Sequence, residues 1–322
     1  MYPLSAALRT AGRLASPGGD TGRLTILTYH RVLDQADPMQ DGDQIDAACF
    51  DQQMQTVKSH FTVLPLGEAL SLQDEGRLPP RALSITFDDG YLDNHSVALP
   101  ILKRHRLPAT FFIATGYLGR GIMFNDQVTE SIRGAGPAPL DLNWLGLGQR
   151  PVGDDTARRQ LAIDVINAVK YLPAGQREEA CQRLWSDTRG GDATPTLMMT
   201  PEQLQDLARA GMVIGGHTHS HPILTRVSLA EAEADIAHNR AVLKDIVGKT
   251  PDLFAYPNGR PQVDFDRPQR DLVEAAGYRA AVTTACGVVT RETDRFQAPR
   301  FSPWPMHPTK LVVHLIRNAW RG

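Results

Sequence analysis

Short apolar runs alternate along this chain with longer segments in which apolar residues recur at helical spacing. The runs are rich in β-branched and aromatic residues, which is typical of buried strands. They lie at 24–29, 61–64, 84–87, 109–113, 212–216, 253–256, 280–283 and 296–301. Helical spacing predicts helices at 47–60, 66–75, 96–106, 157–185, 200–210, 228–247 and 311–320. Because strands and helices alternate, we expect βα units around a mainly parallel sheet.

The segment from Gly134 to Asp155 interrupts this alternation, because glycine and proline crowd together there. Such crowding predicts a long loop or lid bounded by turns, and we interpret Trp144 as the anchor that packs it down. The helical pattern that follows breaks at Pro173, so two inserted helices are expected. The expected organisation is an N-terminal arm at 1–23 and a single domain at 24–322 with an insert at about 134–198.

Composition and charge exclude several classes of protein. The 322 residues are 42% hydrophobic and 22% charged, which is ordinary for a globular domain, and 34 basic and 36 acidic residues leave a net charge of -2. Because no strong positive field results, we expect no nucleic-acid partner. The three cysteines are scattered singly, so we interpret them as small buried residues without a disulfide framework.

The N-terminal residues bear on the location of the protein. The stretch at 1–23 lacks the apolar core of a secretory signal, and no apolar run is long enough for a transmembrane segment. We therefore expect a cytoplasmic protein with a frayed N-terminal arm. Peripheral membrane association through Arg9, Arg13 and the neighbouring leucines is the alternative. The sequence does not indicate an oligomeric state.

Two clusters of polar side chains follow predicted strands. Asp88 and Asp89 end the run at 84–87 and precede a glycine, and His217 and His221 follow the run at 212–216. Adjacent carboxylates cannot both stay ionised at low cost without a cation or donors nearby. Ligands collect at the carboxyl ends of parallel strands, which is where both clusters are expected.

A shared metal ion accounts for both clusters. Two histidines four residues apart can bind one cation if the segment turns helically, and one of the two carboxylates can complete a site with open positions. The other carboxylate is then free to act as a general base on water. The alternative is that Asp88 and Asp89 form a surface turn and each histidine is a hydrogen-bonded core residue. Three histidines within five residues favour the site.

These residues resemble the motifs of the polysaccharide deacetylase family with the NodB homology domain, in its branch with a YHR start. The matching stretches are 86–90 (TFDDG), 215–222 (GGHTHSHP), 28–32 (TYHRV) and 254–259 (FAYPNG). The resemblance covers about 24–300 and implies a distorted (β/α) barrel, usually seven-stranded, with the metal at the carboxyl ends of the strands. It implies that Asp88 is the catalytic base and that Asp89, His217 and His221 are the metal ligands.

Two parts of the family pattern differ in this chain. The third motif of the family often reads RPPYG, whereas 255–259 reads AYPNG, so its arginine is missing. We expect Arg300, at the end of a predicted strand, to take over the role of steadying the base, with a surface salt bridge as the alternative. Asn258 occupies the place where a backbone N–H would help to hold the oxyanion.

The general acid that protonates the leaving amine has several candidates. The family uses a histidine from a C-terminal motif, for which His314, in a predicted helix, and His307 are candidates. His30, at the end of the first predicted strand, is a third candidate. It is equally compatible with substrate binding or with capping of the strand.

The resemblance implies a metal-dependent hydrolase that removes N-acetyl groups from an amino-sugar-containing glycan or its precursor. We expect an N-acetylated saccharide as substrate and Zn²⁺ as the metal, with Co²⁺, Ni²⁺ or Mn²⁺ as alternatives. A non-catalytic glycan-binding relative is one competing hypothesis, suggested by the missing arginine. A non-haem Fe(II) oxygenase is another, because it also uses two histidines and a carboxylate.

Overall fold

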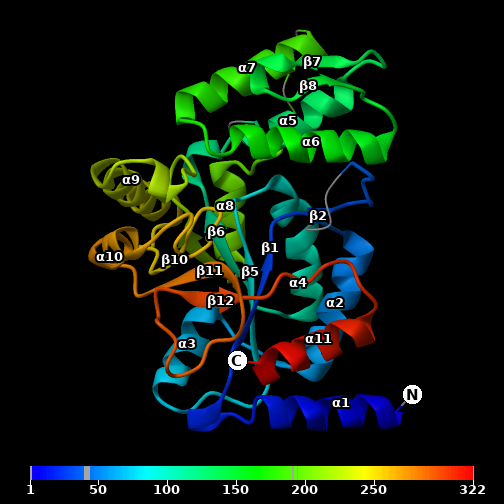
Figure 1. The fold of residues 1–322 in the computed structure, drawn as a ribbon. Helices are drawn as coiled ribbons and strands as arrows, with labels where there is room; N and C mark the ends of the chain where they lie inside the picture. Colours follow the sequence, from blue (N-terminus) through cyan, green and yellow to red (C-terminus); the bar gives the residue numbers. More distant parts are fainter. Residues whose placement is uncertain (1, 40–43, 120, 191, 194, 322) are drawn as a thin grey trace.

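The computed structural model describes residues 2–39, 44–119, 121–190, 192–193 and 195–321, which form a barrel with a helical lobe above it (Figure 1). Seven parallel strands follow one another in the order β1-β5-β6-β9-β10-β11-β12. They are β1 (Thr25–Tyr29), β5 (Ala82–Phe87), β6 (Thr110–Ile113), β9 (Val213–Gly216), β10 (Leu253–Ala255), β11 (Ala280–Cys286) and β12 (Ala298–Arg300). A short strand, β4 (Thr62–Val63), pairs with the start of β5.

The barrel is nearly closed by contacts between its last and first strands. The N–H of Thr28 donates to the carbonyl of Phe301 at 3.0 Å, and the N–H of Phe301 donates to the carbonyl of Ile26 at 2.8 Å. Because the neighbouring strands are parallel, their carboxyl ends share one rim. The expected distorted, seven-stranded (β/α) barrel is confirmed.

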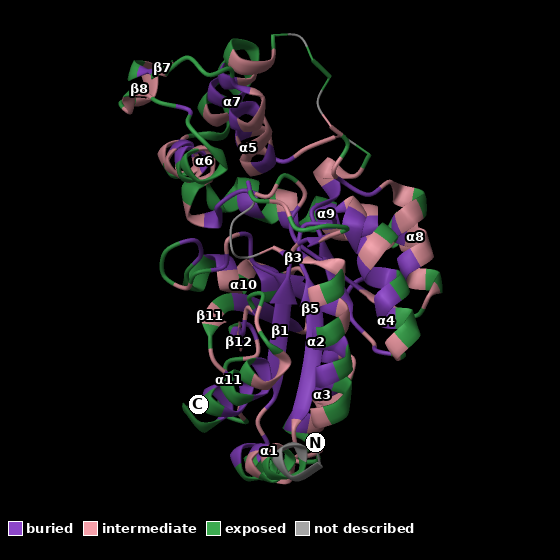
Figure 2. Ribbon diagram, turned by 90° about the vertical axis from the view of Figure 1, so that its right-hand side faces the viewer, coloured by how far each residue is buried: buried purple, intermediate pink, exposed green. Residues whose placement is uncertain are grey.

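The strands are apolar along their length because both of their faces are covered. Every residue of β1 and β5 is buried, and Figure 2 shows these strands at the centre of the molecule. One large core cluster includes Leu27, Ile85 and Phe111, and a second includes Ile26 and Phe112. Covered parallel strands therefore show continuous apolar runs in this sequence rather than alternation.

Helices cover the barrel and begin where the sequence supplies caps. Thr200 and Gln203 form a capping box at the start of α8 (Pro201–Arg209). Ser228 and Glu231 form one at the start of α9 (Leu229–Val247), whose C-cap is Gly248 with φ 72°. The barrel helices are α2 (Ala47–His60), α3 (Leu66–Asp74), α4 (Leu99–His105), α8 (Pro201–Arg209), α9 (Leu229–Val247), α10 (Arg267–Ala275) and α11 (Pro308–Arg321). A two-stranded pair, β2 (Val32–Leu33) and β3 (Ile45–Asp46), lies beside them.

The lobe has a hydrophobic core of its own. It consists of α5 (Phe124–Gly134), the hairpin β7 (Leu140–Leu142) and β8 (Gly148–Arg150), α6 (Asp155–Val169) and α7 (Ala174–Arg189). Its buried side chains cluster with one another, joined from outside by Met39. The lobe thus begins about ten residues before the expected start of the insert, because α5 packs on α6 and α7.

The segment expected as a loop at 134–155 contains the β7–β8 hairpin. Trp144 holds its turn, since the indole N–H donates to the carbonyl of Asp141 at 3.1 Å. The guanidinium of Arg183, on α7, lies 4.6 Å from the centre of the Trp144 ring. Trp144 therefore anchors the β7–β8 hairpin to helix α7 within the lobe.

The N-terminal arm differs from the expectation of a frayed end. Residues Tyr2–Ala15 form α1, which lies beside α11 at the end of the barrel remote from the lobe (Figure 1). Buried Ala15 packs with Val312 and Ile316 of α11, and this contact orders the arm. In the described part of the chain, no helix has the length and apolar character needed to cross a membrane.

The cysteines were expected to be buried, and only one of them is. Cys181 is buried in the lobe, Cys49 is partly exposed and Cys286 is exposed. All three are free thiols. Cys286 is exposed because the end of β11 leaves the covered part of the barrel.

Candidate active site

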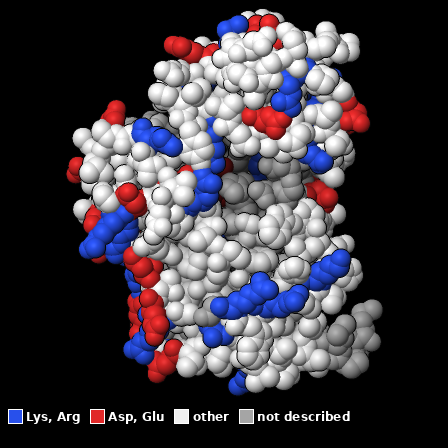
Figure 3. Space-filling view, in the orientation of Figure 1, with Lys and Arg blue, Asp and Glu red and all other residues white. Residues whose placement is uncertain are grey.

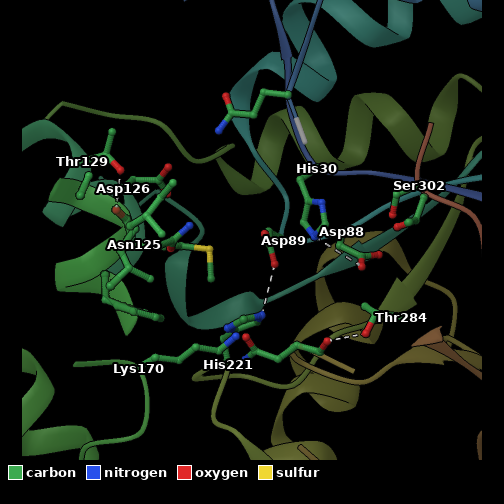
Figure 4. Close-up of a pocket in the computed structure, with 18 of the residues that line it drawn as sticks. His30, Asp88, Asp89, Asn125, Asp126, Thr129, Lys170, His221, Thr284 and Ser302 are labelled. Atoms are coloured by element: carbon green, nitrogen blue, oxygen red, sulfur yellow. Dashed lines mark hydrogen bonds and ion pairs between the residues drawn. The ribbon is translucent and has the colours of Figure 1, made fainter. Parts of the chain in front are cut away.

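A pocket of about 360 Å³ lies at the carboxyl-end rim, between the barrel and the lobe (Figure 4). Most of the residues singled out from the sequence line it. They are His30, Asp88, Asp89, His217, His221 and Asn258. In Figure 3 the same region appears as a hollow below the lobe. The barrel topology thus brings together side chains that are more than a hundred residues apart in the chain.

Asp89, His217 and His221 form a compact triangle of potential metal ligands. Oδ1 of Asp89 lies 3.2 Å from Nε2 of His217 and 3.3 Å from Nε2 of His221, and the two imidazole nitrogens are 3.2 Å apart. Two ligands of a tetrahedral zinc ion with bonds of 2.0–2.1 Å are about 3.3 Å apart. The spacing of the three atoms therefore suits one small cation.

The tautomer of His217 supports the same conclusion. Its Nδ1 lies 2.7 Å from the carbonyl oxygen of Ala255, and because a carbonyl only accepts hydrogen bonds, Nδ1 carries the proton. Nε2 of the neutral ring then directs a lone pair at Oδ1 of Asp89, a buried oxygen without a hydrogen-bond partner. Converging lone pairs repel unless a positive charge lies between them, so these residues fit a divalent metal.

The backbone is left-handed at four non-glycine residues of this rim. The φ angles are 76° at Asp89, 64° at Thr218, 53° at His221 and 58° at Asn258. Such conformations cost about 1–3 kcal/mol each and persist where the surrounding structure holds them. Their concentration at one rim is typical of a functional site.

Asp88 does not join the triangle but pairs with Arg300. Nη1 of Arg300 donates to Oδ1 of Asp88 at 2.8 Å, and Nη2 donates to Oδ2 at 2.6 Å. Arg300 also donates from Nε to the carbonyl of Thr283 at 2.8 Å, and its side chain is fully buried. The surface salt bridge considered for Arg300 is thus wrong, since the arginine is a buried, bidentate partner of Asp88.

The surroundings keep both carboxylates ionised. Burial would raise the pKa of Asp88, but the Arg300 guanidinium more than offsets this and holds that pKa below its usual range. Burial also opposes ionisation of Asp89, but when the facing nitrogens of His217 and His221 carry protons, their hydrogen bonds hold its pKa well below the usual range. The two adjacent acids therefore have different partners and are both anionic at neutral pH.

His30 and Asn258 border the acids, whereas His314 does not. Nε2 of His30 lies 3.9 Å from Oδ2 of Asp88, and 39% of the His30 side chain is exposed. The carbonyl of Asn258 accepts a hydrogen bond from Thr284 Oγ1 at 2.7 Å, so the turn is fixed with Asn258 in the pocket wall. His314 is exposed on α11, outside the pocket, so the structure does not bring it to the site.

A buried network next to the pocket was not expected from the sequence. Asp126 of α5 lines the pocket, accepts from the Tyr91 hydroxyl at 2.8 Å and lies 3.9 Å from Nη1 of Arg31. Arg31 also donates to Asp93 at 2.8 Å. Burial is the main cause that raises the pKa of Asp126 to about 7. Arg31 lies within the 28–32 motif and Tyr91 directly follows the 86–90 motif, but nothing in the sequence shows that a lobe residue meets them.

Fold and site define an α/β barrel with an Asp-His-His cluster and a second, arginine-paired aspartate at its carboxyl-end rim. The chain belongs to the polysaccharide deacetylase family, whose model matches residues 75–281. This membership points to a carbohydrate esterase that removes acetyl groups, and it confirms the family suggested by the motifs.

Individual relatives agree with this assignment. The chain is 19% identical over 280 residues to Bacillus subtilis YxkH, whose name places it among polysaccharide deacetylases, covering 86% of this chain and 70% of that protein. It is 41% identical over 83 residues to poly-β-1,6-N-acetyl-D-glucosamine N-deacetylases of Staphylococcus aureus strains. That match covers 25% of this chain and 29% of the staphylococcal proteins.

Solved structures show the same fold. The deacetylase PplD of Streptococcus pyogenes, solved in complex with acetate, superposes with a TM-score of 0.62 at 19% identity, over 92% of this chain and 99% of that one. IcaB of Ammonifex degensii superposes with a TM-score of 0.60 at 20% identity, over 94% of this chain and 98% of that one. At these identities the likeness concerns the barrel architecture.

Proposed function

We propose that this chain is a metal-dependent hydrolase that removes N-acetyl groups from an amino-sugar-containing glycan or its precursor and releases acetate. The observation that carries the proposal is the division between the two adjacent acids. Asp89 lies within 3.3 Å of both imidazoles, whereas Asp88 is held by Arg300 beside them. One acid is thus arranged to hold a cation and the other to accept a proton.

A divalent metal held by Asp89, His217 and His221 would polarise the acetyl carbonyl and lower the pKa of a water molecule. Zn²⁺ is the expected ion, because the ligands are two imidazoles and one carboxylate at tetrahedral spacing. Co²⁺, Ni²⁺ and Mn²⁺ are also compatible with these ligand atoms.

The residues around the triangle supply the proton transfers. Asp88 accepts a proton from the attacking water, and Arg300 keeps both carboxylate oxygens oriented. The N–H of Asn258 donates a hydrogen bond to the oxyanion that develops on the acetyl group. His30 donates a proton to the leaving nitrogen, because it lies beside Asp88 and is open to the pocket.

Two alternatives are less compatible with the site. A glycan-binding relative without catalysis has no use for a buried Asp88–Arg300 pair, and Arg300 fills the role left open by the arginine missing from 255–259. An Fe(II) oxygenase would use the triangle but would leave Asp88 without a role. The parallel barrel also differs from the all-β jelly roll that the oxygenase hypothesis implies.

Acetate release from a panel of acetylated saccharides tests the proposal. The panel contains oligomers of β-1,6-linked and β-1,4-linked N-acetylglucosamine, and the first of these follows the name of the staphylococcal relatives. Metal content is measured in the same samples. Acetate released in proportion to bound metal supports the proposal. Metal-replete protein that binds a saccharide without releasing acetate would favour the glycan-binding alternative.

A further inference from the structure

One wall of the pocket is formed by the lobe rather than by the barrel. Five residues of α6 and its C-terminal cap face the cavity at helical spacing: Arg159, Ala162, Ile163, Ile166 and Lys170. This face is an apolar stripe with a cation at each end. The cations are eleven residues apart, which is about 16 Å along a helix.

In the described part of the chain, these two cations lack the carboxylate partners that several arginines of the lobe have. Arg133 pairs with Asp37, Arg150 with Asp164 and Arg189 with Glu130. Across the described residues, the guanidinium of Arg159 makes no hydrogen bond or ion pair, and the ammonium of Lys170 lies within 4 Å of no carboxylate. That ammonium is 5.8 Å from the centre of the Tyr171 ring.

The acids near these cations are already engaged. Asp264, whose charge acts on Lys170, is bound by Arg260 Nε at 3.0 Å. Asp88 is paired with Arg300. Asp126 shares Arg31 with Asp93, and burial, which raises its pKa to about 7, reduces its negative charge. Asp89 is the triangle ligand, and a bound divalent ion would more than balance it. Among the residues that the structure describes, the pocket therefore carries an excess of positive charge from α6.

Lys170 is placed to act on a bound substrate. Figure 4 shows its side chain extending from the lobe toward His221. Burial is the main cause that lowers the pKa of Lys170. A partly desolvated ammonium without a carboxylate partner gains most from an anionic ligand, because the attraction is weakly screened there.

We propose that the α6 face, through Lys170 and Arg159, binds an anionic group next to the acetylated sugar, so that the preferred substrate is a phosphate- or carboxylate-bearing N-acetylated saccharide. This proposal rests on the proposed deacetylase function and specifies its substrate class. The aliphatic stripe between the cations packs against the C–H face of the saccharide, and the cations fix its direction.

The test compares charged and neutral substrates with the metal-replete, full-length protein. N-Acetylglucosamine 1-phosphate and a glucuronyl-N-acetylglucosamine disaccharide are the charged probes, and N-acetylglucosamine and N,N'-diacetylchitobiose are their neutral counterparts. Lys170→Met should lower kcat/KM for a charged probe, mainly through KM, by about tenfold or more beyond its effect on the neutral counterpart. Arg159→Met should act in the same direction.

Lys244→Met is the matched control. Lys244 is exposed on α9, outside the pocket, so its removal changes the net charge equally without touching the α6 face. It should leave the ratio of charged to neutral kcat/KM unchanged. The probe whose rate falls in Lys170→Met distinguishes phosphate from carboxylate. A ratio unchanged in both α6 variants would overturn the inference while leaving the deacetylase function intact.

A binding measurement separates this inference from the proposed function. In the Asp88→Asn background, calorimetry of N-acetylglucosamine 1-phosphate should show about tenfold weaker binding when Lys170→Met is added. If no substrate releases acetate but this difference is present, the deacetylase proposal fails and the anion site stands. If the dissociation constants are equal, the anion site is wrong whatever the turnover.

Discussion

Arg300 and Asp88 are joined by two parallel hydrogen bonds of 2.8 and 2.6 Å, although 212 residues separate them in the chain. Arg300 is the last residue of β12, and Asp88 directly follows β5. β1 lies between these two strands in the nearly closed barrel. This pairing supplies the arginine that the stretch 255–259 lacks. Closure of the barrel thus completes the setting of the proposed base.

A substitution of Arg300 should separate the effect of its positive charge on kcat from the effect of its two parallel hydrogen bonds. Arg300→Lys keeps the charge but loses the bidentate contact, so kcat should fall about 10- to 100-fold with little change in metal content. Steady-state acetate release checks the rate. Arg267→Lys, on exposed α10, is the control and should behave as wild type. Full activity in Arg300→Lys would show that the parallel hydrogen bonds are not needed.

The stability of the same pair can be tested without activity. Arg300→Met leaves Asp88 buried and unpaired, which should cost about 3–5 kcal/mol in the free energy of unfolding. The double variant Asp88→Asn/Arg300→Met should recover much of that loss while remaining inactive. Thermal denaturation measures both effects, and a double variant as unstable as Arg300→Met would contradict the pairing energetics.

The proposed base and a proposed metal ligand should respond differently to substitution. Asp88→Asn should reduce acetate release by about a thousandfold or more, in the range lost with a general base, and leave the metal content nearly unchanged. His217→Ala removes a corner of the triangle and should lose both metal and activity. Elemental analysis beside the acetate assay checks this. Full activity in Asp88→Asn would reject Asp88 as the base.

His30 and His314 can be distinguished as proton donors. His30→Gln should lower kcat for an N-acetyl substrate about 100-fold, because the amine leaves poorly without a proton. The loss should be much smaller with 4-nitrophenyl acetate, whose leaving group needs no proton. His314→Gln is the matched variant and should keep wild-type rates, since His314 is exposed on α11. The opposite ranking would return the role to His314.

The role assigned to Asn258 belongs to its backbone. Because φ is 58° there, glycine fits the conformation and keeps the N–H, so Asn258→Gly should retain activity within about threefold. Asn258→Ala should lower the free energy of unfolding by about 1–2 kcal/mol from left-handed strain. Rates and melting temperatures check the pair. A large loss of activity in Asn258→Gly would mean that the side chain takes part.

The raised pKa of Asp126 should make the free energy of unfolding depend on pH. Its pKa is raised to about 7 in the folded protein, above the ordinary value of about 3.9 for an unfolded chain. The folded state therefore binds the proton more tightly, and the contribution of Asp126 to stability is full below pH 4 and is lost as pH rises toward 7. The loss is on the order of 1.4 kcal/mol per pH unit.

The Asp126→Asn variant isolates this contribution. An amide oxygen still accepts from the Tyr91 hydroxyl but does not titrate, so melting temperatures of wild type and variant should diverge between pH 5 and pH 8. Wild type should be the relatively less stable protein at pH 8. A difference in melting temperature that stays constant over this range would show that Asp126 does not titrate there.

Local signals in the sequence were sufficient for much of the fold. The helices expected from 200 and from 228 begin at capping boxes of Thr200 and Ser228, whose contacts act within three residues. The strands were recognisable as continuous apolar runs because both of their faces are covered. Asp88, Asp89, His217 and His221 were found because each pair follows a strand at the same rim. Their chemical roles stay predictions until they are measured.

Other parts of the site depend on tertiary packing that no local pattern records. The helical spacing of α6 was visible, but which of its faces meets the pocket depends on how the lobe sits on the barrel. The contacts of Asp126 with Arg31 and Tyr91 join distant segments in the same way. For Arg300 the sequence allowed two hypotheses, a partner of the base and a surface salt bridge. Only the nearly closed barrel shows that Arg300 is buried beside Asp88.

The separate hydrophobic core of the lobe bears on how such a protein can diversify. The barrel supplies the Asp89-His217-His221 triangle, the proposed base Asp88 and its partner Arg300. The α6 face with its two cations belongs instead to a helix whose buried side chains pack largely within the lobe. Amino-acid substitutions on the pocket face of α6 should therefore leave the geometry of the barrel residues undisturbed. The proposed substrate preference could therefore be altered by substitutions on α6 while the proposed hydrolytic residues of the barrel stay as they are.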